Sequence, residues 1–154
     1  MEDLEHLKYP VGRFQKPSEL CKEHRAGWIK IIEELPEKLK KEVSGLSDAQ
    51  LDTPYRPEGW TVRQTIHHFA DSHINAFIRF KLALTEDKPI IKPYFEDKFA
   101  KLPDTAKAPI ESSLNILDGI HKRFTILLNS MTDEDFERKY IHPARCSLHN
   151  SLGF

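Results

Sequence analysis

Histidine is the residue type that most directly indicates chemistry in this chain. Eight histidines occur in 154 residues, and three of them cluster in the segment His67-His68-Phe69-Ala70-Asp71-Ser72-His73. On a helix, His67 and His68 precede Asp71 by four and three residues, so either pair shares one side of the helix. A neutral imidazole donates a lone pair to a metal, and a neighbouring carboxylate co-ligates the metal or orients the imidazole. The segment therefore indicates a metal site or, more simply, solvent-facing histidines with one core histidine.

Helical periodicity does not decide which histidine would be the ligand. At about 100° per residue, His73 falls in the middle of the apolar stripe, whereas His68 lies about 150° away from it. His68 shares its side with other polar residues, namely Gln64, Asp71, Asn75 and Arg79. Such a polar stripe either faces solvent or lines a polar cleft, and both alternatives remain open.

Two further groups contain cysteine. The first group has the spacing His-x3-Cys-x2-His and consists of His142, Cys146 and His149. This spacing fits half of a zinc site, but the favoured interpretation is a loop that happens to contain these residues. Cys21 precedes His24 by one turn of helix, which does not by itself indicate an activated nucleophile. The sequence has no glycine-rich phosphate loop, no Gly-x-Ser-x-Gly elbow and no Cys-x-x-Cys motif.

The elements that must position these residues are predicted to be helices. Apolar residues recur at three- and four-residue steps from Leu20 to Val43 and predict an amphipathic helix that begins near Pro17 or Ser18. Pro36 lies inside this helix and is expected to kink or break it, because proline lacks the backbone N–H donor.

The histidine cluster lies on a second predicted helix, residues 62–84. Thr61 and Gln64 have the spacing of a capping box, and Trp60 occupies the position of a hydrophobic staple residue. These three residues therefore predict the start of the helix.

Residues 85–109 contain four prolines and show little periodicity. They predict a long loop, which we expect to pack its larger apolar side chains onto the helices: Ile90, Ile91, Tyr94 and Phe95. A third helix is predicted from about Ile110 to Met131.

An internal repeat indicates how these elements are arranged. Residues 46–51, with Ser47 as the expected N-cap, are matched 85 residues later by residues 131–136, and each copy follows a long helix. No segment alternates convincingly with period two. We therefore predict an all-α fold, an up-down four-helix bundle with three long helices and a truncated fourth, so that residues 1–154 form a single domain incomplete at its C-terminus.

Composition excludes several function classes. Lys and Arg number 23 against 24 Asp and Glu, a formal charge of −1, which gives no electrostatic reason to expect a nucleic-acid partner. No stretch approaches 18 consecutive apolar residues, so no membrane span is predicted. The acidic N-terminus does not resemble a signal peptide, and Cys21 and Cys146 do not form a secreted disulfide scaffold, so we expect a cytoplasmic protein.

Several segments resemble the YfiT branch of the DinB superfamily. The resemblance rests above all on residues 59–73, Gly-Trp-Thr-Val-Arg-Gln-Thr-Ile-His-His-Phe-Ala-Asp-Ser-His, and covers essentially the whole chain. The other segments that carry it are Tyr9–Phe14, Leu51–Arg56, Ile91–Tyr94 and Tyr140–Pro143. It implies a cytoplasmic, usually dimeric four-helix bundle that binds zinc or nickel through three histidines. Members are described as metal-dependent hydrolases, and some relatives as S-transferases that use bacillithiol-type thiols.

The resemblance implies one metal ligand within this sequence, His68. It follows Trp60 by eight residues and is itself followed by an apolar residue, Ala70 and Asp71. The two other family ligands lie in a His-x3-His pattern on a fourth helix, beyond a Leu-Gly-hydrophobic segment, and the sequence ends at that segment, Ser151–Phe154. We therefore expect a divalent metal as cofactor, bound poorly by the 154-residue chain alone.

The resemblance thus implies a metal-dependent hydrolase or thiol S-transferase that acts on a small molecule, a low-molecular-weight thiol in the second case. Three neutral histidines leave a coordination position at which water becomes nucleophilic or a thiol binds as thiolate. Asp71 is expected to orient a ligand. The alternative is a non-catalytic, self-associating helical module that has lost two ligands, since an incomplete bundle exposes an apolar groove. A homodimer is expected in either case.

Overall fold

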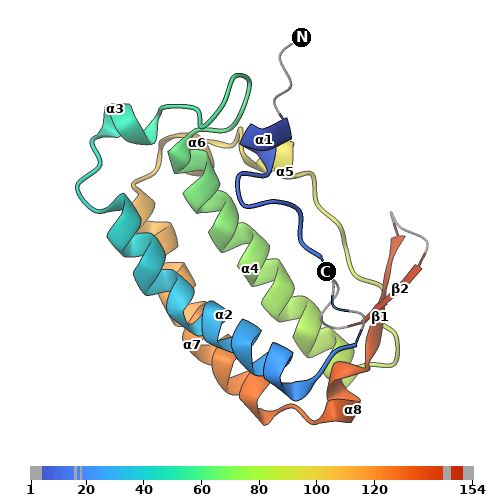
Figure 1. Cartoon of the computed structure of the whole chain (residues 1–154). Helices are drawn as coiled ribbons and strands as arrows, with labels where there is room; N and C mark the ends of the chain where they lie inside the picture. Colours follow the sequence, from blue (N-terminus) through green and yellow to red (C-terminus); the bar gives the residue numbers. More distant parts are fainter. Residues whose placement is uncertain (1–4, 16, 18, 144–146, 151–154) are drawn as a thin grey trace.

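Three long helices make up most of the structure, a computed structural model that describes residues 5–15, 17, 19–143 and 147–150. They are α2 (Lys22–Val43), α4 (Val62–Thr85) and α7 (Ile110–Ser130), and α7 contacts both of the others (Figure 1). The predicted helical class is confirmed. The short elements are α1 (Glu5–Lys8), α3 (Asp48–Leu51), α5 (Glu96–Phe99), α6 (Pro103–Lys107), α8 (Asp133–Phe136), β1 (Lys139–His142) and β2 (Ser147–Asn150).

The apolar core lies along α7. Near one end, Phe77 and Phe80 of α4 meet Phe124 and Leu128 of α7, with Phe136 of α8 beside them. A second cluster, near the start of α7, joins the end of α2 to α3 and α4 through Val43, Leu51, Ile66 and Ile110. Because each fully buried side chain of this size contributes roughly 1.5–3 kcal/mol, these two clusters fix α2 and α4 against α7.

Helix α2 differs from its prediction at two points. It begins at Lys22, with Cys21 as the N-cap, rather than near Pro17. It also runs unbroken through Pro36, which is buried, so the predicted break is wrong. The missing N–H of Pro36 leaves the carbonyl of Ile32 without its helical partner, and that carbonyl finds a donor on α7 instead.

The predicted helix starts are confirmed where the signals are local. Thr61 and Gln64 form the capping box of α4, and α4 ends at Thr85, one residue beyond the expected end. The internal repeat also has a structural counterpart, since α3 and α8 are both four-residue helices capped through Ser47 and Thr132.

The segment between α4 and α7 is not the featureless loop predicted, because it contains α5 and α6. Ile91 is 2% exposed as expected, but Ile90 is 71% and Phe95 is 72% exposed, so these two do not pack onto the helices. Pro89 and Ile91 exchange backbone hydrogen bonds with Ile141 of β1. In extended backbone, consecutive side chains point to opposite sides, which is why Ile91 is buried and Ile90 is not.

A two-stranded antiparallel hairpin is added to the helices. Strands β1 and β2 pair with Tyr140 opposite His149, and Tyr140 is buried. Four residues per strand are too few for an alternating pattern to stand out, which explains why no strand was predicted. No helix in the described ranges is both long enough and apolar enough to cross a membrane.

Candidate metal centre on helix α4

His67 is built into the core. Its side chain is 5% exposed, with Nδ1 2.7 Å from Ser113 Oγ on α7 and Nε2 3.1 Å from the carbonyl oxygen of Ala108. Because a carbonyl oxygen only accepts, Nε2 carries the hydrogen of that bond, and the Ser113 hydroxyl occupies Nδ1. With both ring nitrogens engaged, His67 has no lone pair to offer a metal.

His68 has a different environment. It is half-buried, and its ring meets that of Trp60 at a centroid distance of 4.7 Å and an interplanar angle of 65°. Within the described ranges, no residue hydrogen-bonds to either of its ring nitrogens. An imidazole that is packed against an aromatic ring while its nitrogens stay free is able to bind a metal. Of the two adjacent histidines, His68 is therefore the one available as a ligand.

The polar stripe of α4 does not face open solvent. Gln64, His68, Asp71, Asn75 and Arg79 are all half-buried. The segment between α4 and α7 covers part of the stripe, since Gln64 Nε2 donates to the carbonyl of Ala100 at 2.7 Å. The alternative in which the stripe lines a partly enclosed polar region is thus the one the structure supports.

Asp71 is the carboxylate of this region. Burial raises the pKa of its carboxyl group, and the charge of Asp104 raises it further, whereas His68 and His67 lower it. Asp71 follows His68 by three residues, so the acid and the available imidazole lie on one side of α4. Burial also raises the pKa of Tyr94, whose hydroxyl interacts with Ser72.

His73 faces α7, as its position in the apolar stripe predicted. Its Nδ1 lies 2.6 Å from Nε2 of His121, and Nδ1 of His121 lies 2.5 Å from the carbonyl oxygen of Ile32. Burial first, and then the charges of His121 and His68, lower the pKa of His73 to about 4. Burial likewise lowers the pKa of His121. We call these two residues the His121–His73 pair.

Within the described residues, neither cysteine-containing group forms a metal site. Cys21 Sγ does lie 3.0 Å from His24 Nδ1, but both residues are exposed and cap the first turn of α2. In the other group, Cys146 and the side chain of His149 lie outside the described residues, so the predicted half-site is not visible.

The described residues do not form a complete metal site. They contain no group of three or more His, Cys, Asp or Glu side chains that converges on one point. A zinc site needs three protein ligands for catalysis and four for a structural role. Within this part of the chain, His68 supplies at most one ligand of a larger set.

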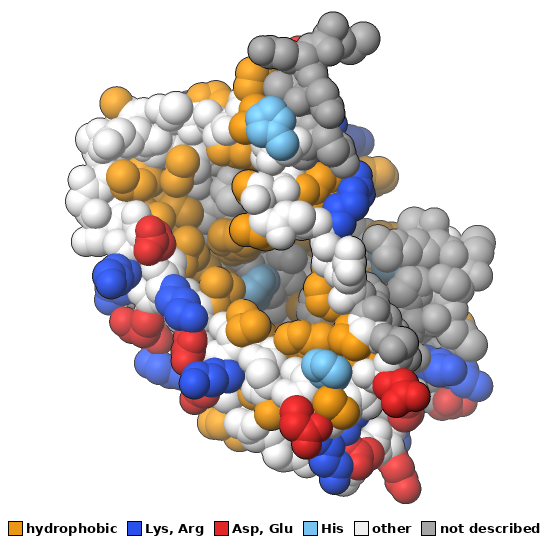
Figure 2. Space-filling model, viewed as in Figure 1, with side chains coloured by type: hydrophobic (Ala, Val, Ile, Leu, Met, Phe, Trp, Pro, Cys, Tyr) orange, Lys and Arg blue, Asp and Glu red, His pale blue; other side chains and the backbone are white. Residues whose placement is uncertain are grey.

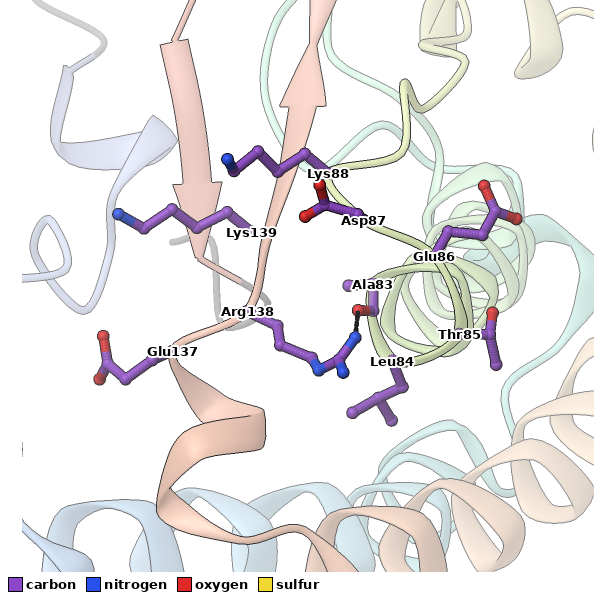
Figure 3. A pocket seen from close by; sticks show the side chains of 9 residues that line it. All are labelled: Ala83, Leu84, Thr85, Glu86, Asp87, Lys88, Glu137, Arg138 and Lys139. Carbon is purple, nitrogen blue, oxygen red and sulfur yellow. Dashed lines mark hydrogen bonds between the residues drawn. The ribbon is translucent and has the colours of Figure 1, made fainter.

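A separate cavity of about 630 Å³ lies at the C-terminal end of α4, away from the histidines (Figure 3). Its walls carry both signs of charge, including Glu86, Lys88 and Lys139. Arg138 is used structurally there, because its guanidinium donates to the carbonyl of Ala83 at 3.1 Å. The cavity therefore has no convergent set of catalytic groups.

Sequence reasoning missed His121 and Ser113, the α7 partners of His73 and His67. Each pair is formed by residues more than 40 positions apart, which no local pattern links. One signal was available for His121. Pro36 leaves the carbonyl of Ile32 without a donor, so a buried donor on a neighbouring helix is required.

The structure defines a helical bundle with a cluster of histidines on α4, and sequence comparison gives its family. The sequence profile described as DinB superfamily matches residues 31–152, and the chain belongs to that superfamily. A Bacillus subtilis relative, "Putative metal-dependent hydrolase YfiT", is 46% identical over 151 residues, covering 96% of this chain and 85% of the relative. A Geobacillus thermodenitrificans relative, "Putative metal-dependent hydrolase", is 50% identical over 138 residues, covering 90% of this chain and 78% of the relative.

A solved structure agrees with the sequence comparison. The structure of YfiT from Bacillus subtilis, described as having "an unusual four-helix bundle topology", matches with a TM-score of 0.92 at 44% identity. The match covers 96% of this chain and 85% of that one. The predicted family and bundle fold are thereby confirmed.

Proposed function

We propose that this protein is a metal-dependent enzyme of the DinB superfamily in which His68 supplies one ligand to a divalent zinc or nickel ion. The observation that carries the proposal is the contrast between two adjacent histidines. His67 has both ring nitrogens engaged, whereas those of His68 have no partner among the described residues. The designation of the relatives as metal-dependent hydrolases supports the same assignment.

The remaining ligands have to come from outside the described residues, since those residues contain no converging set of three. We place them on a fourth helix that follows the hairpin in the whole protein, as the resemblance implies. A metal bound there would supply a Lewis acid that activates water or a low-molecular-weight thiol. Trp60 holds the His68 ring, and Asp71 lies on the same side of α4 and favours a positively charged centre.

The test is a reaction that separates the two chemistries. The whole protein, including the expected fourth helix, is loaded with zinc or nickel and offered an aromatic electrophile with a low-molecular-weight thiol, and separately an activated ester without thiol. Thiol-dependent loss of the electrophile indicates a transferase, and thiol-independent ester cleavage a hydrolase. If the protein catalyses neither reaction and elemental analysis finds no bound metal, the enzyme assignment is contradicted.

The alternative of a self-associating module rests on the apolar surface. Figure 2 shows a hollow over α2 and α4 that is lined with hydrophobic side chains. Ile31 on α2 is 60% exposed, and Phe14 and Val11 in the N-terminal segment are 59% and 98% exposed. Large exposed apolar patches favour association. A metal-free dimer in light scattering, inactive in both reactions, would favour this alternative, whereas a metal-loaded dimer fits the enzyme.

A further inference from the structure

Pro36 leaves one carbonyl group of α2 without its helical partner. In an α-helix the N–H of each residue donates to the carbonyl four residues earlier. Pro36 has no N–H, so Ile32 loses its helical donor, although α2 continues to Val43. Leaving a buried carbonyl without a donor destabilises the folded protein, so a replacement is expected.

His121 supplies that replacement and thereby has its own protonation fixed. Its side chain is 1% exposed, and its Nδ1 lies 2.5 Å from the Ile32 oxygen. Since a carbonyl oxygen only accepts, Nδ1 carries the hydrogen. Burial disfavours the charged imidazolium, which lowers the pKa of His121. A neutral imidazole with hydrogen on Nδ1 has a lone pair on Nε2.

The protonation of His73 follows from that of His121. Its Nδ1 is 2.6 Å from the lone pair on His121 Nε2, so it has to donate. The two ring planes are inclined by only 20° with centroids 4.8 Å apart, which describes rings edge to edge in nearly one plane. That arrangement suits a hydrogen bond between ring nitrogens. With hydrogen on Nδ1 and a pKa of about 4, His73 carries a lone pair on Nε2 at neutral pH.

The lone pair on His73 Nε2 is not used within the described structure. No described residue hydrogen-bonds to it, and it is not among the fully enclosed polar atoms. His73 is half-buried, and its other ring contact is with Phe69. His68 lies five residues earlier on α4, which is about 7.5 Å along the helix axis, so the two imidazoles belong to neighbouring turns of one helix.

We propose that His73 is a ligand-binding residue of the His68 site, whose Nε2 accepts a hydrogen bond from a hydroxyl or thiol of the bound small molecule. Pro36 and His121 are positioning residues that fix the tautomer of His73. The proposal deepens the proposed function and rests on it for the location of the small molecule. The low pKa means that His73 accepts the hydrogen bond without taking the proton, so it stays a neutral acceptor between pH 5 and 8.

The charged groups around the pair leave this assignment in place. A cavity of about 460 Å³ between α2 and α7 lies on the side of His121, and its ionisable walls are Glu33, Glu37, Asp118 and Lys122. Asp118 is neutralised by Lys122 at 2.7 Å. Neither Glu33 nor Glu37 accepts a hydrogen bond from His121, whose Nδ1 is directed to the Ile32 carbonyl. No carboxylate in the described ranges therefore stabilises a charged form of either ring by direct contact.

The first experiment reads the tautomers directly and needs neither metal nor substrate. Long-range ¹H–¹⁵N correlation spectra of the ¹⁵N-histidine-labelled chain at pH 7 should show hydrogen on Nδ1 and none on Nε2 for both His121 and His73. Pro36→Ala restores a helical donor to the Ile32 carbonyl and should mix the tautomers of both rings. Pro103→Ala, at the first turn of α6, is the matched control and should not. A hydrogen on His73 Nε2 in the unaltered protein would overturn the inference.

A chemical probe tests whether the lone pair is accessible. Diethyl pyrocarbonate acylates unprotonated imidazole nitrogens, and peptide mass spectrometry locates the product. Between pH 7 and pH 5.5 an ordinary histidine with a pKa near 6.5 should slow about eightfold, whereas His73 should keep nearly its full rate. Exposed His6 is the internal reference. If His73 is not modified at either pH, its lone pair is not accessible to a ligand and the proposal fails.

A third measurement separates this proposal from the proposed function. In the metal-loaded whole protein with a thiol co-substrate, His73→Phe should raise the KM for the thiol at least tenfold, with a smaller change in kcat. His73→Gln retains a hydrogen-bond acceptor, so its KM should lie between those of the unaltered protein and His73→Phe. Bound metal should be unchanged in both variants. An unchanged KM in His73→Phe contradicts the role of His73 only. A whole protein without metal or activity contradicts the proposed function, while the tautomer result still decides the state of His73.

Discussion

Two sides of helix α4 carry histidines in opposite states. On the side that faces α7, His67 and His73 are fixed by partners, Ser113 with Ala108 for the first and His121 for the second. On the side that faces the 86–109 segment, the His68 ring packs against Trp60, and its nitrogens have no hydrogen-bond partner among the described residues. The comparison shows that the neighbouring helix decides how many ring nitrogens of each histidine stay available: none in His67, Nε2 alone in His73, and both in His68 among the described residues.

Removing His68 should have the largest effect. In the whole protein, His68→Ala should lower zinc or nickel affinity at least a hundredfold, because the two remaining ligands rarely hold a metal tightly. His67→Ala should change the affinity by less than threefold. Isothermal titration with each metal measures both variants. Equal losses in the two would mean that the contrast between the two sides does not determine the metal site.

Acid should destabilise the side that faces α7. The pKa of His73 is lowered from 6.5 to about 4 in the folded state, so the unfolded chain takes up a proton first as the pH falls. The free energy of unfolding therefore has its full value above pH 6.5 and declines between pH 6.5 and pH 4. His73 accounts for about 3 kcal/mol of this decline. His121 acts in the same direction.

Urea unfolding as a function of pH measures this decline. Among the described residues, the ionisable groups near the pair are Glu33, Glu37, Asp118, Lys122 and His68. The double variant His73→Leu, His121→Phe should flatten the profile between pH 6.5 and 5. His24→Gln, at an exposed position, should leave it unchanged. A flat profile in the unaltered protein would show that the pair is not held neutral.

Loss of the His67 partner should have a smaller effect. Ser113 is 6% exposed, and Ser113→Ala removes the hydroxyl at His67 Nδ1 without replacing it. The expected loss of stability is about 1–2 kcal/mol with no change in metal affinity. Ser112→Ala, one position earlier and exposed, is the matched control. A metal-binding defect in Ser113→Ala would indicate that His67 takes part in the site.

The smallest effect is expected at Asp71. Burial raises the pKa of its carboxyl group, so the charged form is disfavoured in the folded protein. Asp71→Asn should therefore stabilise the metal-free chain at pH 7 by a few tenths of a kcal/mol, up to about 0.5 kcal/mol. Thermal unfolding compares it with Asp118→Asn, which should destabilise slightly through loss of the Lys122 pair. A marked loss of stability in Asp71→Asn would show that the carboxylate is paired.

Local signals predicted the fold well. The capping boxes at Ser47 and Thr61 and the 3.6-residue periodicity located α3, α4 and α7 to within about a residue, because these patterns concern contacts along one segment. The errors arose where distant segments meet. Pro36 was expected to kink or break α2, and no break occurs because His121 on α7 supplies a donor to the Ile32 carbonyl. The exposure of Ile90 was missed because its pairing with a strand after α8 decides it.

The candidate site was predicted only in part for the same reason. The sequence located three histidines on one helix, and the family resemblance singled out His68. Neither could assign a partner to His67 or His73, since Ser113 and His121 lie 46 and 48 residues further along the chain. Periodicity correctly predicted that His73 faces inward, but an inward histidine and a ligand look alike until the partners of each nitrogen are known.

Paramagnetic broadening by nickel tests the central contrast most directly. Ni²⁺ added stepwise to the ¹⁵N-histidine-labelled protein at pH 7 broadens the signals of the imidazole it contacts, even when binding is weak. We expect His68 to broaden first and His73 to follow at higher concentration, while His67 and His121 keep sharp signals longest. Broadening that begins at His67, or at His73 before His68, would contradict the assignment of His68 as the available ligand of helix α4.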